Sequence, residues 1–222
     1  MTQKKAVHFF SSLGLLLTLS LFHSLVRADT QSQIDKVIAR LNSISFVQGQ
    51  FAQEKKLTGL AYALKAQGHF MFWKAQGLYL ATDKPFFNAM TITSTSMINW
   101  QADGSGSIAQ EQSGIVQREI NKTLLAFFSA DIALIQQRFN TTWVFDNDKW
   151  QLTLVPKLDV ILKNMRSAVI HGDNNLQGLS VVAGNGDQTT LAFSAQIVRV
   201  APSAADCRWF YLQAEEACNK FK

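Results

Sequence analysis

One stretch of the chain, residues 67–95, places bulky apolar side chains on both faces of a predicted strand. Successive side chains of a strand point to opposite faces, so Phe70 and Phe72 would share one face while Met71 and Trp73 share the other. A sheet with one face in water normally carries a row of polar side chains on that face. Because both rows are apolar here, this part of the sheet needs a second apolar cover or a bound ligand.

The sequence predicts about ten short strands joined by turns of hairpin size. They are expected near residues 47–52, 61–73, 78–80, 90–92, 97–100, 143–145, 150–156, 168–171, 176–182 and 189–198, with Ile108 and Ile115–Gln117 continuing the sheet. Consecutive strands with short turns form an antiparallel sheet. A sheet this wide cannot stay flat, so we expect it to curl strongly.

Two segments have the spacing of amphipathic helices. Ile34, Val37 and Leu41 recur at intervals of three and four within residues 31–45. Residues 121–139 predict one broken helix or two short ones, with Asn121 and Asp131 as N-caps. Both segments are too apolar on one side to stand alone, so we expect them inside the curled sheet as a plug or lid. The predicted fold class is α+β, mainly β, with a single strongly curved antiparallel sheet and helices covering its concave mouth.

The N-terminus has the features of a secretory signal peptide. Lys4 and Lys5 precede an apolar run at residues 13–22, and residues 26–28 suit a signal peptidase. We predict cleavage after Ala28, export to the periplasm and a single domain at residues 29–222. An uncleaved anchor is the alternative, but the apolar run is short for a membrane span.

Removal of residues 1–28 leaves 18 basic and 16 acidic residues, and the formal charge falls from +5 to +2. This small charge does not support nucleic-acid binding. The remaining 194 residues can bury a sizeable core. We expect the exported protein to be a monomer.

The two cysteines, Cys207 and Cys218, lie close together near the C-terminus. In an oxidising compartment such a pair forms a disulfide, which here would staple the C-terminal tail. The predicted cleavage site has no cysteine to carry a lipid, so we expect a soluble protein.

No constellation in the sequence favours catalysis, a metal or a cofactor. His69 and His171 stand apart from any cluster of metal ligands. The sequence Gly104–Ser105–Gly106 lacks the strand-to-helix context of a nucleophile elbow, and Gly184–Asp187 lies between two strands as a hairpin turn would. We therefore predict no enzymatic activity, no cofactor and no metal site.

Several segments taken in order resemble a known family. They are the sequence FVQGQFAQE from Phe46, GHF from Gly68 onward to Pro85, a helical pair around residues 124–139, WQLTLVPK from Trp150, and GDQTTLAF from Gly186. In their order and spacing, over residues 31–198, they resemble the LolA family of periplasmic lipoprotein carriers. The resemblance implies an unclosed β-barrel whose apolar hollow takes up acyl chains of lipoproteins. It also implies an inner-membrane transporter as donor and an outer-membrane acceptor, which in that family is LolB.

The chain departs from the family pattern at two places. The family has Arg-Pro in a strand turn and a Trp shortly afterwards, and the matching positions here are Lys74, Ala75 and Leu80. In the family the arginine helps to hold the lid closed, which makes Lys74 a candidate lid latch, although lysine lacks the planar fork of arginine. The departures indicate a divergent member.

The predicted function is a soluble periplasmic carrier that buries acyl chains of lipoproteins or a related lipid and moves them from the inner to the outer membrane. The floor of its cavity is expected to consist of Phe51, Phe70, Phe72, Leu78, Leu80, Met90 and Ile92, and its lid of Phe127, Phe128, Ile132 and Ile135. Met71 and Trp73 replace the floor residues if the strand faces the other way. Ordinary core packing is the alternative for each of these side chains. The alternative function is a lipid-sensing regulator or export accessory with the same half-barrel, a class that usually carries a further C-terminal domain.

Overall fold

The structure, a computed structural model, describes residues 30–109 and 115–221. Two compact units are present, residues 1–36 and residues 37–222. In the first unit, residues 30–36 are helical, and Gln31 Nε2 donates to Asp35 Oδ1 at 2.9 Å, one turn further on. The predicted signal peptide lies outside the described residues and stays a prediction.

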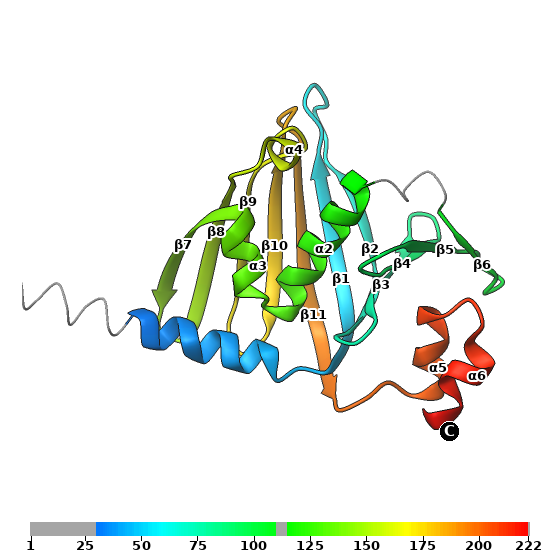
Figure 1. Ribbon diagram of the computed structural model, residues 1–222. Coiled ribbons are helices and arrows are strands. Elements are labelled where there is room, and N and C mark those ends of the chain that lie inside the picture. The colour runs from blue at the N-terminus through cyan, green and yellow to red at the C-terminus, as the bar shows by residue number, and fades with distance from the viewer. Residues whose placement is uncertain (1–29, 110–114, 222) are drawn as a thin grey trace, which may run out of the picture. The chain divides into compact units, whose positions relative to one another are not determined.

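The second unit is built on one sheet of eleven antiparallel strands in the order β6-β5-β4-β3-β2-β1-β11-β10-β9-β8-β7 (Figure 1). Neighbours in the sheet are neighbours in sequence except at one place, where β1 pairs with β11 and joins two meanders. The strands are β1 (Phe46–Lys56), β2 (Leu64–Trp73), β3 (Gly77–Lys84), β4 (Asn88–Ile92), β5 (Met97–Trp100), β6 (Gly106–Ile108), β7 (Phe139–Asp146), β8 (Lys149–Pro156), β9 (Met165–Gly172), β10 (Leu176–Ala183) and β11 (Gln188–Arg199).

The two edge strands, β6 and β7, do not pair with each other, so the sheet stays unclosed. The segment that connects them in the chain contains α2 (Ile115–Ser129) and α3 (Ile132–Arg138). Figure 1 shows both helices lying over one face of the sheet. The predicted fold class, a single unclosed antiparallel sheet with helices over one face, is therefore confirmed.

The start of α2 corrects one prediction. Ile115–Gln117 was expected to continue the sheet, but these residues form the first turn of a fifteen-residue helix. A short apolar run does not distinguish helix from strand by its period, and the longer helical pattern that follows decides the conformation. Asn121, expected as an N-cap, consequently lies inside α2, where it is 2% exposed.

The cap predicted at Asp131 is confirmed. Its side chain accepts a hydrogen bond from the Leu134 backbone N–H at 3.0 Å, which satisfies one of the free donors at the start of α3. Ala130, between the two helices, has φ of 50°, a left-handed conformation that lets the chain reverse direction there.

The two central strands approach each other closely at Gly68. A Cβ at this position would lie 1.9 Å from the carbonyl oxygen of Ala81, so only glycine fits beside β3. The register between β2 and β3 shifts at the same place, between Gln67 and Gly68. Such shifts bend a strand and increase its twist, which helps the wide sheet to curve.

The alternating stretch places apolar side chains in two separate cores, as the sequence indicates. Phe70, Phe72 and Leu78 belong to the helix-covered core, the cluster that also contains Phe127, Phe128 and Ile135 of α2 and α3. Met71, Trp73 and Tyr79 belong to the tail-covered core on the opposite face. The second cover that the sequence requires is thus the chain's own C-terminal tail.

The tail, residues 201–221, consists of short helical segments that pack on the sheet. They are α5 (Ala204–Cys207), η2 (Arg208–Phe210), α6 (Ala214–Cys218) and η3 (Asn219–Phe221), while α4 (Asp159–Leu162) lies elsewhere, between β8 and β9. The ring of Trp73 lies 5.4 Å from that of Phe210 and 5.5 Å from that of Phe221. Cys207 and Cys218 form the predicted disulfide across this segment.

Candidate functional site

The predicted cavity floor comes together on the helix-covered face. Phe51, Phe70, Phe72 and Leu78 are all at most 4% exposed in the helix-covered core, and Leu80 packs against it. Met90 and Ile92 lie opposite Leu80 and Leu78 in the β3–β4 register, and side chains of directly paired residues share a face of the sheet. The floor is therefore a row of apolar side chains across β1 to β4.

The predicted lid residues lie directly against this floor. The ring of Phe128 is 5.5 Å from that of Phe72, 6.3 Å from that of Phe70 and 5.5 Å from that of Phe193 on β11. Phe127 and Ile135 are also buried in the helix-covered core, and Ile132 packs on its edge. The alternative floor residues, Met71 and Trp73, lie under the tail instead.

At one place between the helices and the sheet, side chains of the described residues leave only a small void. One void lies between residues 37–41, α2, α3 and strands β7 to β9, with a volume of about 10 Å³. That volume holds roughly one water molecule, whereas small-molecule pockets begin at roughly 300 Å³. An acyl chain can enter this void only if α2 or α3 moves away from the sheet.

Sequence reasoning missed a buried polar contact between the two helices. Arg138 of α3 is 7% exposed and its Nη1 donates to Thr123 Oγ1 of α2 at 2.5 Å. Lys157 Nζ, at the end of β8, donates to the carbonyl of Gln136 at 2.7 Å. Arg138 follows Ile132 and Ile135 at intervals of three, so it lies on the apolar side of α3. This spacing is the sequence signal that could have identified Arg138 as a buried residue.

Comparison with known proteins identifies the family. The family model described as outer membrane lipoprotein carrier protein LolA matches residues 42–206, which is most of the chain. The chain belongs to the LolA family. No curated protein matches the chain.

Among solved structures, this LolA-family chain is similar to three proteins at low identity. A LolA superfamily protein from Nitrosomonas europaea is 9% identical with a TM-score of 0.39, over 76% of this chain and 94% of that one. A putative outer membrane lipoprotein-sorting protein domain from Vibrio parahaemolyticus is 9% identical with a TM-score of 0.41, over 85% and 95%. The MucA/MucB complex of Pseudomonas aeruginosa has a matching chain that is 12% identical, with a TM-score of 0.45, over 79% and 59%.

The latch candidate of this LolA-family chain, Lys74, contacts the N-terminal helical segment and not α2 or α3, which carry the four predicted lid side chains. Its Nζ donates to the carbonyl oxygen of Asn42 at 2.8 Å and to Asn42 Oδ1 at 3.2 Å. Asn42 is the last helical residue of the segment at residues 30–42, where a cation is favourable because carbonyl groups point outward. Within the described residues, Arg138 rather than Lys74 makes the polar contact between the two lid helices.

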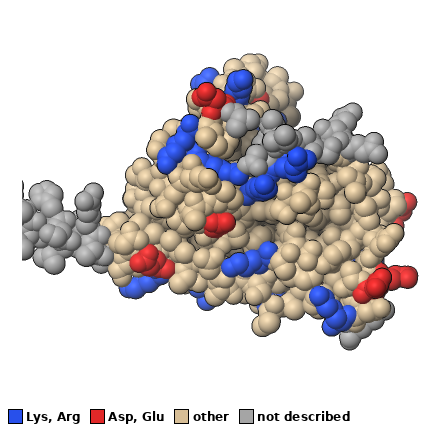
Figure 2. Space-filling model, in the orientation of Figure 1, with Lys and Arg blue, Asp and Glu red and all other residues tan. Residues whose placement is uncertain are grey.

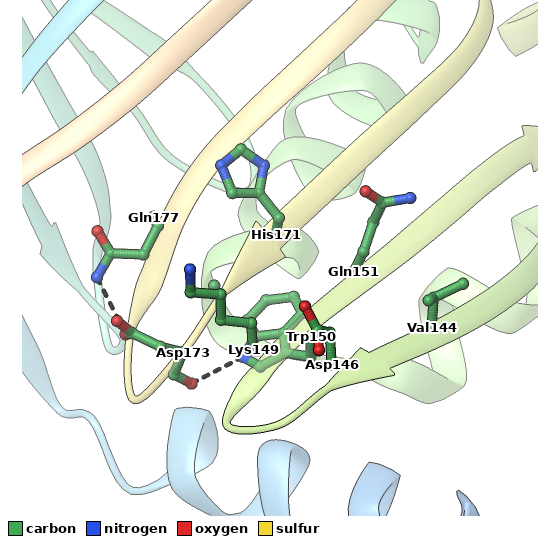
Figure 3. A pocket seen from close by; sticks show the side chains of 9 residues that line it. Val144, Asp146, Lys149, Trp150, Gln151, His171, Asp173 and Gln177 are labelled. Atoms are coloured by element: carbon green, nitrogen blue, oxygen red, sulfur yellow. Dashed lines mark hydrogen bonds between the residues drawn. The ribbon is translucent and has the colours of Figure 1, made fainter.

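A second hollow of the LolA-family chain is open and is lined by both apolar and polar groups. It has a volume of about 430 Å³ and lies beside β7, β8 and β9, with Trp150, His171 and Asp173 on its wall (Figure 3). Trp150 Nε1 donates to the backbone carbonyl of Asp173 at 2.8 Å, and Gln177 Nε2 donates to Asp173 Oδ1 at 3.0 Å. Burial would raise the pKa of Asp173, but hydrogen bonds, led by the Asn175 N–H, outweigh it and lower that pKa.

The imidazole of His171 and the carboxylate of Asp173 lie apart in this open hollow. In Figure 3, His171 and Gln151 stand on neighbouring strands, away from the hydrogen-bonded Asp173. Across residues 30–109 and 115–221, no three histidine, cysteine or acidic side chains are grouped as metal ligands. In the same residues, no helix is long and apolar enough to cross a membrane.

Proposed function

We propose that this LolA-family protein is exported through a cleaved signal peptide and acts in the periplasm as a soluble carrier. It buries the acyl chains of a lipoprotein or a related lipid, receives them from an inner-membrane transporter and delivers them to an outer-membrane acceptor. The work is binding and release without covalent chemistry. The observation that carries the proposal is the contact of Phe128 with Phe70 and Phe72, an apolar lid seated on an apolar floor.

The energies of the two states favour a reversible exchange. Each methylene group moved out of water contributes about 0.8 kcal/mol, so one acyl chain of common length contributes on the order of 10 kcal/mol. The four lid side chains, Phe127, Phe128, Ile132 and Ile135, each contribute about 1.5–3 kcal/mol when buried, or roughly 6–12 kcal/mol together. Because these two sums are similar, cargo can displace the lid and the lid can later displace the cargo.

Displacement is compatible with the way in which the helices are attached. The lid segment joins the chain at the two edge strands, β6 and β7, and its helices bury apolar side chains in the helix-covered core. Polar contacts are present as well, because Asn121 Nδ2 donates to the Ser96 carbonyl and Lys157 Nζ donates to the Gln136 carbonyl. Apolar contacts are non-directional, so hydrocarbon can replace the apolar part of this attachment. In the proposed loaded state, the acyl chain lies on the floor residues and the apolar face of α2 lies over it.

The test is to recover the processed protein from the periplasm, extract it with organic solvent and analyse the extract by mass spectrometry. The proposal expects acylated peptide or lipid at near-stoichiometric yield. It also expects the emptied protein to take up a fluorescent fatty acid and to release it to acceptor vesicles. Lipid that binds but is never released would favour the lipid-sensing regulator, and hydrolysis of an added ester would contradict the carrier.

A further inference from the structure

Exposed apolar side chains are concentrated in two neighbouring connections at one end of the sheet. Phe86 in the β3–β4 connection is 81% exposed and Tyr62 in the β1–β2 connection is 67% exposed. We define the loop patch as the exposed apolar side chains of these connections and the adjoining strand start, namely Leu60, Tyr62, Leu64, Phe86 and Phe87. Large side chains exposed together in this way mark an interaction surface.

The two connections lie beside each other. Gln67 of β2 pairs with Lys84 of β3, directly next to the turn that carries Phe86. A groove lined by Lys65, Lys84 and Pro85, among others, runs between the same segments. The loop patch is therefore one continuous region rather than scattered single residues.

The same end of the sheet continues through two further connections. Thr58 in the β1–β2 loop donates its backbone N–H to Asp187 Oδ1 in the β10–β11 loop at 2.8 Å. That loop in turn contacts the segment around α4, where the Gly184 N–H donates to the Asn164 carbonyl at 3.2 Å. Leu158 and Leu162 of this segment are 44% and 46% exposed. Four neighbouring connections thus form one end that is rich in exposed apolar side chains.

The charge at this end is positive. The basic residues there are Lys55, Lys56, Lys65, Lys84, Lys157, Lys163 and Arg166, and the acidic ones are Glu54, Asp83, Asp159 and Asp187, which gives 7 − 4 = +3. Lys65 and Lys84 have no ion-pair partner among the described residues, whereas Glu54 pairs with Lys56 and Asp83 with His69. In Figure 2, several Lys and Arg side chains lie on the upper part of the face, where Figure 1 places α4 and the β1–β2 loop.

The opposite end of the strands has a different composition. Its hairpin connections, residues 74–76, 93–96, 146–149 and 173–175, contain no large exposed apolar side chain, and the exposed apolar residue just beyond β11 is the aliphatic Val200. They hold Lys74 and Lys149 against Asp146, Asp148 and Asp173, which gives 2 − 3 = −1. The combination of exposed aromatic rings and unpaired lysines is therefore a property of one end and not of loops in general.

We propose that the loop patch docks this protein on an anionic phospholipid surface. Aromatic and aliphatic side chains of exposed loops enter the interface between head groups and acyl chains, and nearby lysines are attracted to anionic head groups. The loop patch offers both, with Phe86 and Tyr62 foremost and Lys65 and Lys84 at their base. Docking would bring the proposed carrier to the membrane where its cargo is exchanged. Only this purpose of the docking rests on the proposed carrier function.

The test is co-sedimentation of the processed protein with two kinds of vesicle. One contains phosphatidylglycerol with phosphatidylethanolamine, and the other contains phosphatidylcholine alone. We expect binding to the anionic vesicles that weakens with salt. Each phenyl ring withdrawn from the interface weakens partitioning about ten- to a hundredfold, so Phe86→Ser with Phe87→Ser should nearly abolish sedimentation. Lys65→Gln with Lys84→Gln should weaken binding to anionic vesicles roughly fivefold per lysine.

The matched control is Val200→Ser. Val200 is 90% exposed just beyond β11, at the other end of that strand, so its loss should leave sedimentation unchanged. Wild-type protein that does not sediment with anionic vesicles, or an unchanged Phe86→Ser, Phe87→Ser variant, would overturn the proposal. A wild-type dimer that this variant converts to monomer, without vesicle binding, would assign the surface to a second copy of the chain instead.

Fatty-acid uptake measured without vesicles separates docking from carrying. Both loop-patch variants should take up the fluorescent fatty acid like wild type, because Phe86 and Lys65 lie outside the helix-covered core. If wild type takes up no fatty acid but still binds vesicles, the carrier function fails and the docking surface stands. If it takes up fatty acid but binds no vesicles, the docking surface alone fails.

Discussion

Removal of the Phe128 ring should weaken the closed state and strengthen fatty-acid binding. Phe128 is 9% exposed and lies among Phe70, Phe72 and Phe193 at ring distances of 5.5–6.3 Å. Truncation of a buried phenylalanine to alanine destabilises a protein by about 3–5 kcal/mol. In the proposed mechanism, cargo must displace this ring from the floor. Phe128→Ala therefore removes a side chain that competes with the acyl chain for the same apolar surface.

The expected gain in affinity is bounded by that energy. If about 1.4 kcal/mol of the destabilisation belongs to the closed state alone, the dissociation constant for the fatty acid falls tenfold. The loaded state also loses part of this energy, because in wild type the Phe128 ring would pack on the cargo and in the variant it is absent. We therefore expect roughly tenfold tighter uptake together with a lower midpoint of urea unfolding.

Phe210→Ala is the matched control for this experiment. Phe210 is 3% exposed and packs on Trp73 in the tail-covered core, so its truncation should lower stability by a similar amount. It should leave fatty-acid affinity unchanged. Unchanged affinity in Phe128→Ala, or an equal change in both variants, would refute the displacement of α2. The milder variant Phe128→Leu keeps the comparison possible if the alanine variant unfolds.

Two further perturbations test the tail. Cys207→Ser should destabilise the protein by about 3 kcal/mol, because the disulfide closes a loop with a sequence separation of 11, and the loss should appear in urea unfolding followed by tryptophan fluorescence. Burial would raise the pKa of Asp206, but hydrogen bonds from Ser203 and Arg199 outweigh it and lower that pKa. Because the folded-state pKa is depressed, Asp206 contributes stability above about pH 3.9 that is lost as the pH falls through its folded-state value. Asp206→Asn should therefore unfold more easily than wild type at neutral pH, and its free energy of unfolding should change less as the pH falls. An identical pH dependence of stability in the two proteins would contradict this role of Asp206.

Strand positions and both cores followed from local patterns, and the failures occurred where patterns were short. The period of two from Phe70 to Trp73 fixes which side chains share a face, whatever packs on them. The three residues Ile115–Gln117 are too few to show a period, and the helix that starts there was missed. The pair Arg138 and Thr123 was missed for another reason, since a buried polar contact between two helices depends on their relative placement, which no local pattern contains.

The choice between the two faces also lay beyond local patterns. Phe70 and Phe72 on one side are as apolar as Met71 and Trp73 on the other, so the alternation left both open as a cavity floor. Long-range packing decides between them, because the tail returns to the sheet after β11 and covers Trp73 and Tyr79. The cysteines indicated that the tail is stapled, but not which face it covers.

The two covers of the sheet differ in how firmly they are attached, and this difference is what a reversible carrier requires. The tail cover is closed by the Cys207–Cys218 disulfide and by the capped start of α5, where Asp206 also binds Arg199 of β11. The helices α2 and α3 contain no cysteine, so no disulfide ties them to the sheet, and they bury Phe127, Phe128 and Ile135 against it. In the proposed carrier, hydrocarbon would therefore compete with α2 and α3 more readily than with the tail. The face that such competition would open is the one that carries Phe70 and Phe72.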